Sequence, residues 1–280
     1  MAGALIYRPY NEIRSAITDC LKKKRPFTVI FQNETVSFQS KWGSGTTRQN
    51  RYSIDDINFI KSVKHYIVKN ELYIPYLNFK IPGDGKVKYF QYSSSLKANQ
   101  KIKNVINVDL SGAYWEAAYK LGLISDVIYQ KGLTVDKFVR LTAIGSLAKK
   151  VYKLEYDGKR QKKKEVISSE LTECLWDVIC MQVSNVLQDA ANAAGKDFIF
   201  FWVDGIYIRT AALKSVEKCF KKHGYKFKID TSISSIETTQ KHLFVNLTKP
   251  IIRVINGKET KVFHKPFPFR GRSISGAINK

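Results

Sequence analysis

Two aspartates lie in apolar segments where a carboxylate is unexpected. Asp109 is the fourth residue of INVDL (106–110), and Asp204 interrupts FIFFWVDGIYIR (198–209). Burying a bare carboxylate costs several kcal/mol, so each acid must be paired, protonated or bound to a metal. Taken singly, each also fits a salt-bridged aspartate at a strand end. If the two strands are neighbours, both carboxylates face one point and could hold two Mg²⁺ ions about 4 Å apart, which would activate a 3′-hydroxyl and stabilise a leaving pyrophosphate.

The segments around the two acids alternate between strand and helix patterns. The apolar runs predict strands at 106–110, 198–209, 225–230, 234–238 and 241–247, and a hairpin at 153–167 around Asp157-Gly158. The helical patterns lie at 111–122, 133–152 with Thr134 as N-cap, 168–195 and about 211–223. Together they predict an α+β fold, an antiparallel sheet with helices on one face.

Residues 1–100 predict a mixed α/β region with its own short elements. We expect a helix at 10–23, a hairpin formed by 27–31 and 34–38, and a polar loop at 40–51. Ser53 is a plausible N-cap for a helix over 53–70, and a second hairpin is expected from 71–94, with its turn at 82–85. This region could bind template or cover the other face of the sheet.

The residues around both acids resemble motifs of family B DNA polymerases. VDLSGAY (108–114) is similar to the first palm motif, D-x-x-S-L-Y, and FWVDGIYI (201–208) to the third, Y-x-D-T-D-S. RLTAIGSLAKK (140–150) is a looser match to the middle motif, K-x-x-x-N-S-x-Y-G, and QKHLFVNL (240–247) to the strand that contacts the primer end. The segments occur in the family order over about residues 101–248. The chain departs from the family at Trp202, which replaces the first acid of the third motif.

The resemblance implies a catalytic site at the two acids. Asp109 and Asp204 match the catalytic and metal-binding acids, Leu110 joins the expected metal site, and Mg²⁺ is the expected cofactor, with Mn²⁺ as the alternative. Tyr114 matches the tyrosine under the incoming sugar and would favour deoxynucleotides. The expected nucleotide-binding residues are Ser111, Gly112, Ala113, Tyr114, Lys137 and Arg140.

Two of these residues are also suggested by spacing. Lys137 and Arg140 share one face of the expected helix at 133–152 and could clamp a triphosphate, although a solvated basic face is the alternative. Tyr114 could equally be a core tyrosine.

The basic residues predict a polyanionic partner. The chain has 47 Lys+Arg against 24 Asp+Glu, a net charge of +23, and residues 149–164 contain eight basic residues against two acids. We expect this run to be a hairpin that grips the phosphate backbone, with a merely solvated hairpin as the alternative. The expected DNA-binding residues are Lys149, Lys150, Lys159, Arg160, Lys162, Lys163, Lys164 and Lys241.

The resemblance also implies a reduced enzyme. No exonuclease region precedes the palm, the fingers shrink to about 115–150, and 249–280 is a tail or vestigial thumb. The expected domains are therefore a mixed region at 1–100, a palm at 101–248 and that tail. No apolar run is long enough for a membrane span and no secretory signal is evident, so we expect no membrane partner. Scattered cysteines and histidines argue against zinc.

The leading hypothesis is a minimal DNA polymerase or primase-polymerase. It would act on a DNA template and primer strand with dNTPs, beside a replication helicase or single-strand-binding protein. A phage or plasmid origin would place it in the cytoplasm of a bacterial host. The alternative is a catalytically silent palm that binds nucleic acid as a replication accessory, which Trp202 favours. A reverse transcriptase or RNA polymerase palm is disfavoured, because the third motif has no Asp-Asp pair.

Overall fold

The chain folds into two compact units, and each unit is built from two separate segments. The computed structural model describes residues 9–32, 35–48, 53–82, 87–148, 150–168, 170–255 and 258–269. The first unit comprises Met1–Gly85 with Ala117–Ile179, and the second comprises Lys86–Glu116 with Cys180–Lys280. The sequential division expected at residues 100 and 248 therefore differs from the interleaved division in the structure, because the hairpin near residue 157 pairs with a strand from the N-terminal region.

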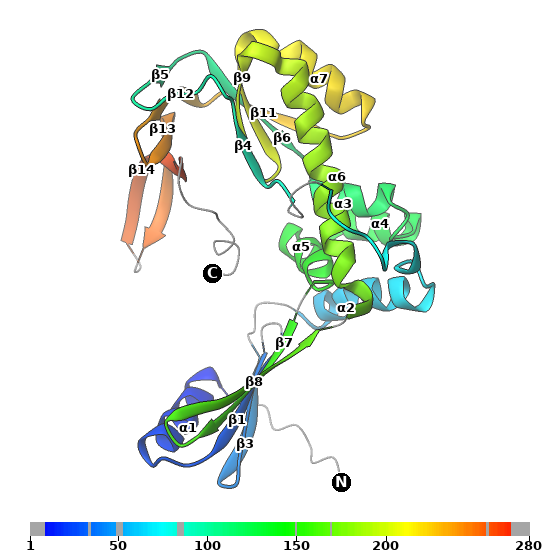
Figure 1. The fold of residues 1–280 in the computed structure, drawn as a ribbon, viewed down its shortest axis with the longest axis vertical. Helices are drawn as coiled ribbons and strands as arrows, with labels where there is room; N and C mark the ends of the chain where they lie inside the picture. The colour runs from blue at the N-terminus through cyan, green and yellow to red at the C-terminus, as the bar shows by residue number, and fades with distance from the viewer. Residues whose placement is uncertain are drawn as a thin grey trace. The chain divides into compact units, whose positions relative to one another are not determined.

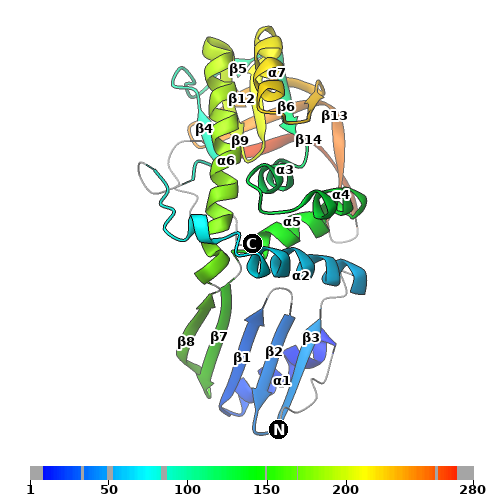
Figure 2. The same ribbon diagram turned by 90° about the vertical axis from the view of Figure 1, so that its right-hand side faces the viewer.

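A five-stranded antiparallel sheet forms one part of the first unit (Figure 2). Its order is β3-β2-β1-β7-β8, with bounds β1 Phe27–Gln32, β2 Thr35–Ser40, β3 Gly43–Arg48, β7 Lys150–Asp157 and β8 Arg160–Ser168. Helix α1 (Tyr10–Lys22) buries Ile13 and Cys20 against Phe27, Val29 and Phe38 of this sheet. The expected hairpins at 27–38 and around Asp157-Gly158 are both confirmed.

The rest of the first unit is helical. Helix α2 (Ile54–Lys69) begins at a capping box, in which the Ser53 side chain accepts from the Asp56 N–H and the Asp56 carboxylate accepts from the Ser53 N–H. The remaining helices are η1 Ile74–Tyr76, α4 Asp126–Thr134, α5 Lys137–Gly145 and the start of α6 Glu170–Ala194. Among the described residues, no helix is both long and apolar enough to cross a membrane.

The second unit contains an antiparallel sheet in the order β11-β6-β10-β9-β4. The strands are β4 Phe90–Tyr92, β6 Val105–Leu110, β9 Phe198–Trp202, β10 Gly205–Arg209 and β11 Phe227–Asp230. Helix α3 (Ala113–Lys120) follows β6, and α7 (Leu213–Lys222) joins β10 to β11 through the short η3 (Thr210–Ala212). The succession β6–α6–β9–β10–α7–β11 and the order β11-β6-β10-β9 give the ferredoxin-like arrangement of a split β-α-β fold.

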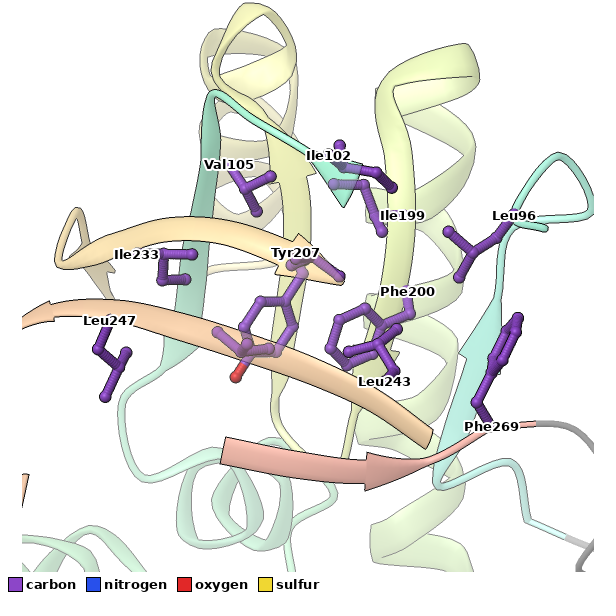
Figure 3. Close-up of a cluster of buried hydrophobic side chains, with 12 residues drawn as sticks. Leu96, Ile102, Val105, Ile199, Phe200, Tyr207, Ile233, Leu243, Leu247 and Phe269 are labelled. Carbon is purple, nitrogen blue, oxygen red and sulfur yellow. The ribbon is translucent and has the colours of Figure 1, made fainter. Parts of the chain in front are cut away.

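The two faces of this sheet have different covers (Figure 1). Helices α6 and α7 lie on one face, and a second antiparallel sheet, β14-β13-β12-β5, lies on the other. Its strands are β5 Lys101–Ile102, β12 Ile233–Thr238, β13 His242–Ile255 and β14 Lys258–Pro268. Phe200 and Tyr207, which stack with centroids 4.2 Å apart, pack against Leu243 and Ile233 of the second sheet (Figure 3). The α+β fold is thus as expected, with helices on one face of the central sheet.

Four local predictions are wrong. The expected loop at 40–51 contains β3, which extends the β1–β2 hairpin. The expected hairpin at 71–94 is instead η1 followed by β4, which pairs with β9. The expected helix at 133–152 is divided, because Thr134 ends α4 and the Asp136 side chain caps α5 by accepting from the Phe138 N–H. The expected strand at 198–209 is the β9–β10 hairpin.

Candidate active site

The main chain joins the two aspartates of the second unit. Strands β6 and β10 are adjacent and antiparallel, with Asp109 opposite Gly205. Asp204 immediately precedes Gly205, and its carbonyl oxygen accepts a hydrogen bond of 2.9 Å from the Leu110 N–H. The segments that carry the two acids are therefore neighbours, as the two-metal hypothesis requires, although Asp204 itself lies in the turn before β10.

Asp204 lies in a strained two-residue turn. Strand β9 ends at Trp202 and β10 begins at Gly205, so Val203 and Asp204 connect them. Val203 has a φ of +60°, a conformation that is costly for a β-branched side chain. Its N–H donates to the Tyr89 carbonyl at 2.6 Å, which helps hold the turn in place. Backbone strain of this kind occurs most often where a fold must present a functional group.

Two side-chain oxygens converge over Gly205. Asn107 and Asp109 lie two residues apart on β6 and therefore on the same face of the sheet. A Cβ placed on Gly205 would lie 2.9 Å from Asn107 Oδ1 and 3.1 Å from Asp109 Oδ1. Asn107 is only 9% exposed, and its Oδ1 is buried without a hydrogen-bond partner among the described residues. Asn107 Nδ2 lies 3.5 Å from the same point, so the absence of a side chain at Gly205 lets the ends of both side chains lie close over its backbone.

The carboxylates create a negative environment on this face. Burial raises the pKa of the Tyr207 hydroxyl, and the nearby charges of Asp230, Asp109 and Asp204 raise it further. Burial likewise raises the pKa of Tyr114, with smaller contributions from Cys180, Asp204 and Tyr89. Asp109 and Asp204 therefore both act electrostatically on the Tyr207 hydroxyl. Tyr207 packs with Phe200 and with residues of the β14-β13-β12-β5 sheet.

The donor set fits a hard divalent cation. Oxygen ligands from carboxylates and amides are those that Mg²⁺ and Mn²⁺ prefer. Within the described ranges, no group of three or more His, Cys, Asp or Glu side chains is positioned to hold a metal, so a cation here would depend on two carboxylates and neutral oxygens. Leu110 has a buried side chain, and only its main-chain oxygen could serve as a ligand.

The expected nucleotide-binding residues divide between the two units. Ser111 and Gly112 form the turn after β6, where Gly112 adopts a φ of +65°, and Ala113 and Tyr114 begin α3. Tyr114 is buried, with 8% of its surface exposed, near Asp204. Lys137 and Arg140 instead belong to α5 of the first unit, whereas Asp109 and Asp204 belong to the second.

The basic hairpin β7–β8 also belongs to the first unit. Its exposed cations are Lys159, Arg160, Lys162, Lys163 and Lys164. Lys162 pairs with Asp157 at 2.7 Å, Lys163 with Glu165 at 3.5 Å, and Lys164 Nζ lies 5.0 Å from the centre of the Tyr152 ring. Such exposed pairs are weak, so these cations remain able to contact phosphates.

Three other expected DNA-binding residues are placed differently. Lys149 lies outside the described residues, and so does the side chain of Lys150, at the start of β7. Lys241 is exposed before β13, and its carbonyl accepts from the Phe269 N–H.

The sequence reasoning missed three residues of the site. Asn107 could have been found, since a polar residue two positions before Asp109 in VINVDL must share its face. Gly205 could be recognised only once β6 was known to pair with β10. Lys228, exposed on β11 directly opposite Asp109, had no signal in the sequence because its strand partner was unknown.

The sequence was compared with protein families and with curated proteins. No protein-family model matches it, and no curated protein sequence matches it significantly.

Proposed function

We propose that the protein is a minimal template-directed nucleotidyltransferase, a small DNA polymerase or primase-polymerase with a family-B-like palm. The observation that carries this proposal is the pairing of β6 with β10, which joins Asp109 to the turn that bears Asp204. Two acids on the central antiparallel strands, with helices on the opposite face, suit a site that binds nucleotide phosphates through divalent cations.

Each residue of the site has a role in this proposal. Asp109, Asp204 and the Leu110 carbonyl would hold Mg²⁺, or Mn²⁺ in its place. The cation would neutralise phosphate charge and lower the pKa of a 3′-hydroxyl. Tyr114, of which 8% is exposed, would contact the sugar of an incoming dNTP, and the turn at Ser111-Gly112 is proposed to bind the triphosphate. Ala113 begins α3 and contributes its N–H at a helix start.

The first unit would supply the nucleic-acid contacts. Lys137 and Arg140 are proposed for the triphosphate, and the exposed cations of β7–β8 for the backbone of template and primer. Lys241 would contact the primer end. A helicase or single-strand-binding protein of a phage or plasmid replicon, in the cytoplasm of a bacterial host, would be the partner.

The direct test is primer extension with Mg²⁺ or Mn²⁺ on primed and unprimed templates of DNA and of RNA. We expect DNA products from dNTPs, and a loss of more than about a hundredfold in Asp109→Ala and Asp204→Ala. Lys214→Ala, an exposed change on α7, is the matched control. Absence of extension by the parent protein with either metal would rule the proposal out.

A second candidate is a catalytically silent palm that binds DNA as a replication accessory. It is favoured by Trp202, whose ring stacks on Phe90 and contacts Phe267 edge-on, with a distance of 5.3 Å between ring centroids in each pair. In the alignment with the polymerase motif, this aromatic cluster takes the position of the first acid. DNA binding that persists without extension, and that does not change in Asp109→Ala, would favour this second function.

A further inference from the structure

The amide of Asn107 is an unexplained polar group in the core of the second unit. It lies on β6, the strand next to the edge strand β11, where Tyr207 of β10 and Asp230 of β11 are its neighbours in register. Its side chain is nine-tenths buried, and Oδ1 has no hydrogen-bond partner among the described residues. An unsatisfied buried acceptor costs about 1–3 kcal/mol, so the position calls for a partner beyond the described residues, such as a bound cation or water.

The geometry indicates where that partner would lie. Asn107 Oδ1 and Asp109 Oδ1 are 2.9 and 3.1 Å from one point, the place of the missing Gly205 Cβ. The two oxygen acceptors are the atoms nearest to this point, with Asn107 Nδ2 farther away at 3.5 Å, and Asp204 adjoins Gly205 along the chain. Oxygens that converge on a common point and supply no proton suit a cation better than an anion.

The local charge favours a cation as well. Asp109, Asp204 and Asp230 each act to raise the pKa of Tyr207, the residue opposite Asn107. Asp230 accepts from the N–H and hydroxyl of Ser232, whereas Asp109 and Asp204 are the acids closest to Gly205 in the strand register, with Lys228 opposite Asp109 on β11.

We propose that Asn107 Oδ1 is a ligand of the divalent cation held by Asp109 and Asp204. This inference rests on the proposed function, since it concerns the same cation. The amide supplies a third side-chain oxygen in a site where Trp202 replaces the usual first acid of the third motif. It adds no negative charge, which limits repulsion between the half-buried carboxylates of Asp109 and Asp204 when the cation is absent.

The test measures metal binding by the full-length protein, independently of catalysis. Mn²⁺ is titrated into each variant while free Mn²⁺ is followed by electron paramagnetic resonance, and thermal unfolding is recorded with and without Mn²⁺. In Asn107→Leu, which keeps the volume and removes the oxygen, we expect the dissociation constant to rise about tenfold or more. In Asn107→Asp, which adds a charged ligand, we expect it to fall.

Two further measurements separate ligation from folding. Without metal, Asn107→Leu is expected to unfold at or above the parent temperature, because an orphaned acceptor is removed. With Mn²⁺, the parent gains thermal stability and Asn107→Leu gains less. The matched control is Asn246→Leu on β13 of the same unit, where the lost amide donates to Ser235 Oγ at 3.1 Å and Mn²⁺ affinity should not change.

The outcomes distinguish this inference from the proposed function. Unchanged Mn²⁺ affinity in both Asn107 variants would overturn the inference and assign the amide to bound water, even if primer extension is normal. Parent-like affinity in Asp109→Asn would also overturn it, since the cation would then bind elsewhere. Affinity that depends on Asn107, Asp109 and Asp204 in a protein without extension activity would support the inference while the polymerase proposal fails.

Discussion

The N–H of Leu110 donates a hydrogen bond of 2.9 Å to the carbonyl oxygen of Asp204. This bond ties the end of β6 to the β9–β10 turn, two segments that are nearly a hundred residues apart in the chain. Main-chain pairing therefore helps to fix the positions of Asp109 and Asp204. For this reason the site can be altered one side chain at a time without removing the bond that aligns it.

Gly205→Ala should impair the site without unfolding the protein. The new Cβ would meet Asn107 Oδ1 at 2.9 Å and Asp109 Oδ1 at 3.1 Å, and both side chains would have to turn away. We expect the free energy of unfolding, measured by urea denaturation, to change by no more than about 1 kcal/mol. The reason is that the crowded atoms are the ends of side chains that can rotate. Mn²⁺ affinity should fall about tenfold or more.

The matched control for Gly205→Ala is Gly145→Ala at the end of α5. An added Cβ there meets no atom within 4 Å. Mn²⁺ affinity in this variant should equal that of the parent. An equal loss of Mn²⁺ affinity in both variants would show that Gly205→Ala does not act through Asn107 and Asp109.

Val203→Gly should stabilise the protein. A valine at φ +60° carries strain that a glycine at the same position does not, and the gain outweighs the greater flexibility of an unfolded chain with glycine. We expect the free energy of unfolding to increase by about 1 kcal/mol, measured by urea denaturation. If the strain serves to present Asp204, the same variant will bind Mn²⁺ more weakly; a less stable variant would contradict the strain argument.

Stability should fall steeply above pH 10. Burial raises the pKa of Tyr92 to about 12, and it also raises the pKa of Tyr114, Tyr207 and Tyr225. Below pH 10 these phenols are protonated in both the folded and the unfolded protein. Above it, the unfolded chain releases protons that the folded chain retains, so unfolding is favoured by about 1.4 kcal/mol per pH unit for each tyrosine. For Tyr92 the loss continues until about pH 12.

Two measurements check this alkaline behaviour. Urea denaturation between pH 9 and 11.5 gives the slope of stability with pH, and phenolate absorbance near 295 nm counts ionised tyrosines. At pH 11 the folded protein should show about four fewer phenolates than the protein in denaturant. Tyr92→Phe should lower the slope, and an unchanged slope would show that Tyr92 does not contribute.

Replacing Lys159 and Arg160 together by alanine should weaken DNA binding at every sequence tested. Both side chains are exposed at the tip of the β7–β8 hairpin. If each contacts one phosphate, the slope of log affinity against log salt should decrease by roughly 1.4–1.8, depending on whether the DNA is single- or double-stranded. The control, Lys214→Ala with Lys218→Ala on α7, changes the net charge equally and should leave the slope nearly unchanged.

Local sequence determined most of the individual elements. The N-cap at Ser53 and the apolar run of β6 each depend on neighbouring residues, and both were predicted correctly. The sequence also marked Asp109 and Asp204 as exceptional, since a carboxylate in an apolar strand is costly wherever that strand lies.

Only the tertiary structure decided which segments belong together. The sequence places β7–β8 beside the palm motifs, but its strands pair with β1 and belong to the first unit. Likewise β4 pairs with β9. Asn107 and Asp109 lie close to Gly205 because Asp109 is its register partner on the neighbouring strand. Strand pairing joins residues far apart in the chain through main-chain bonds that any side chain permits, so local sequence carries little record of it. The two acids were visible in the sequence, whereas their alignment, and the amide of Asn107 beside them, followed from the register of β6 and β10.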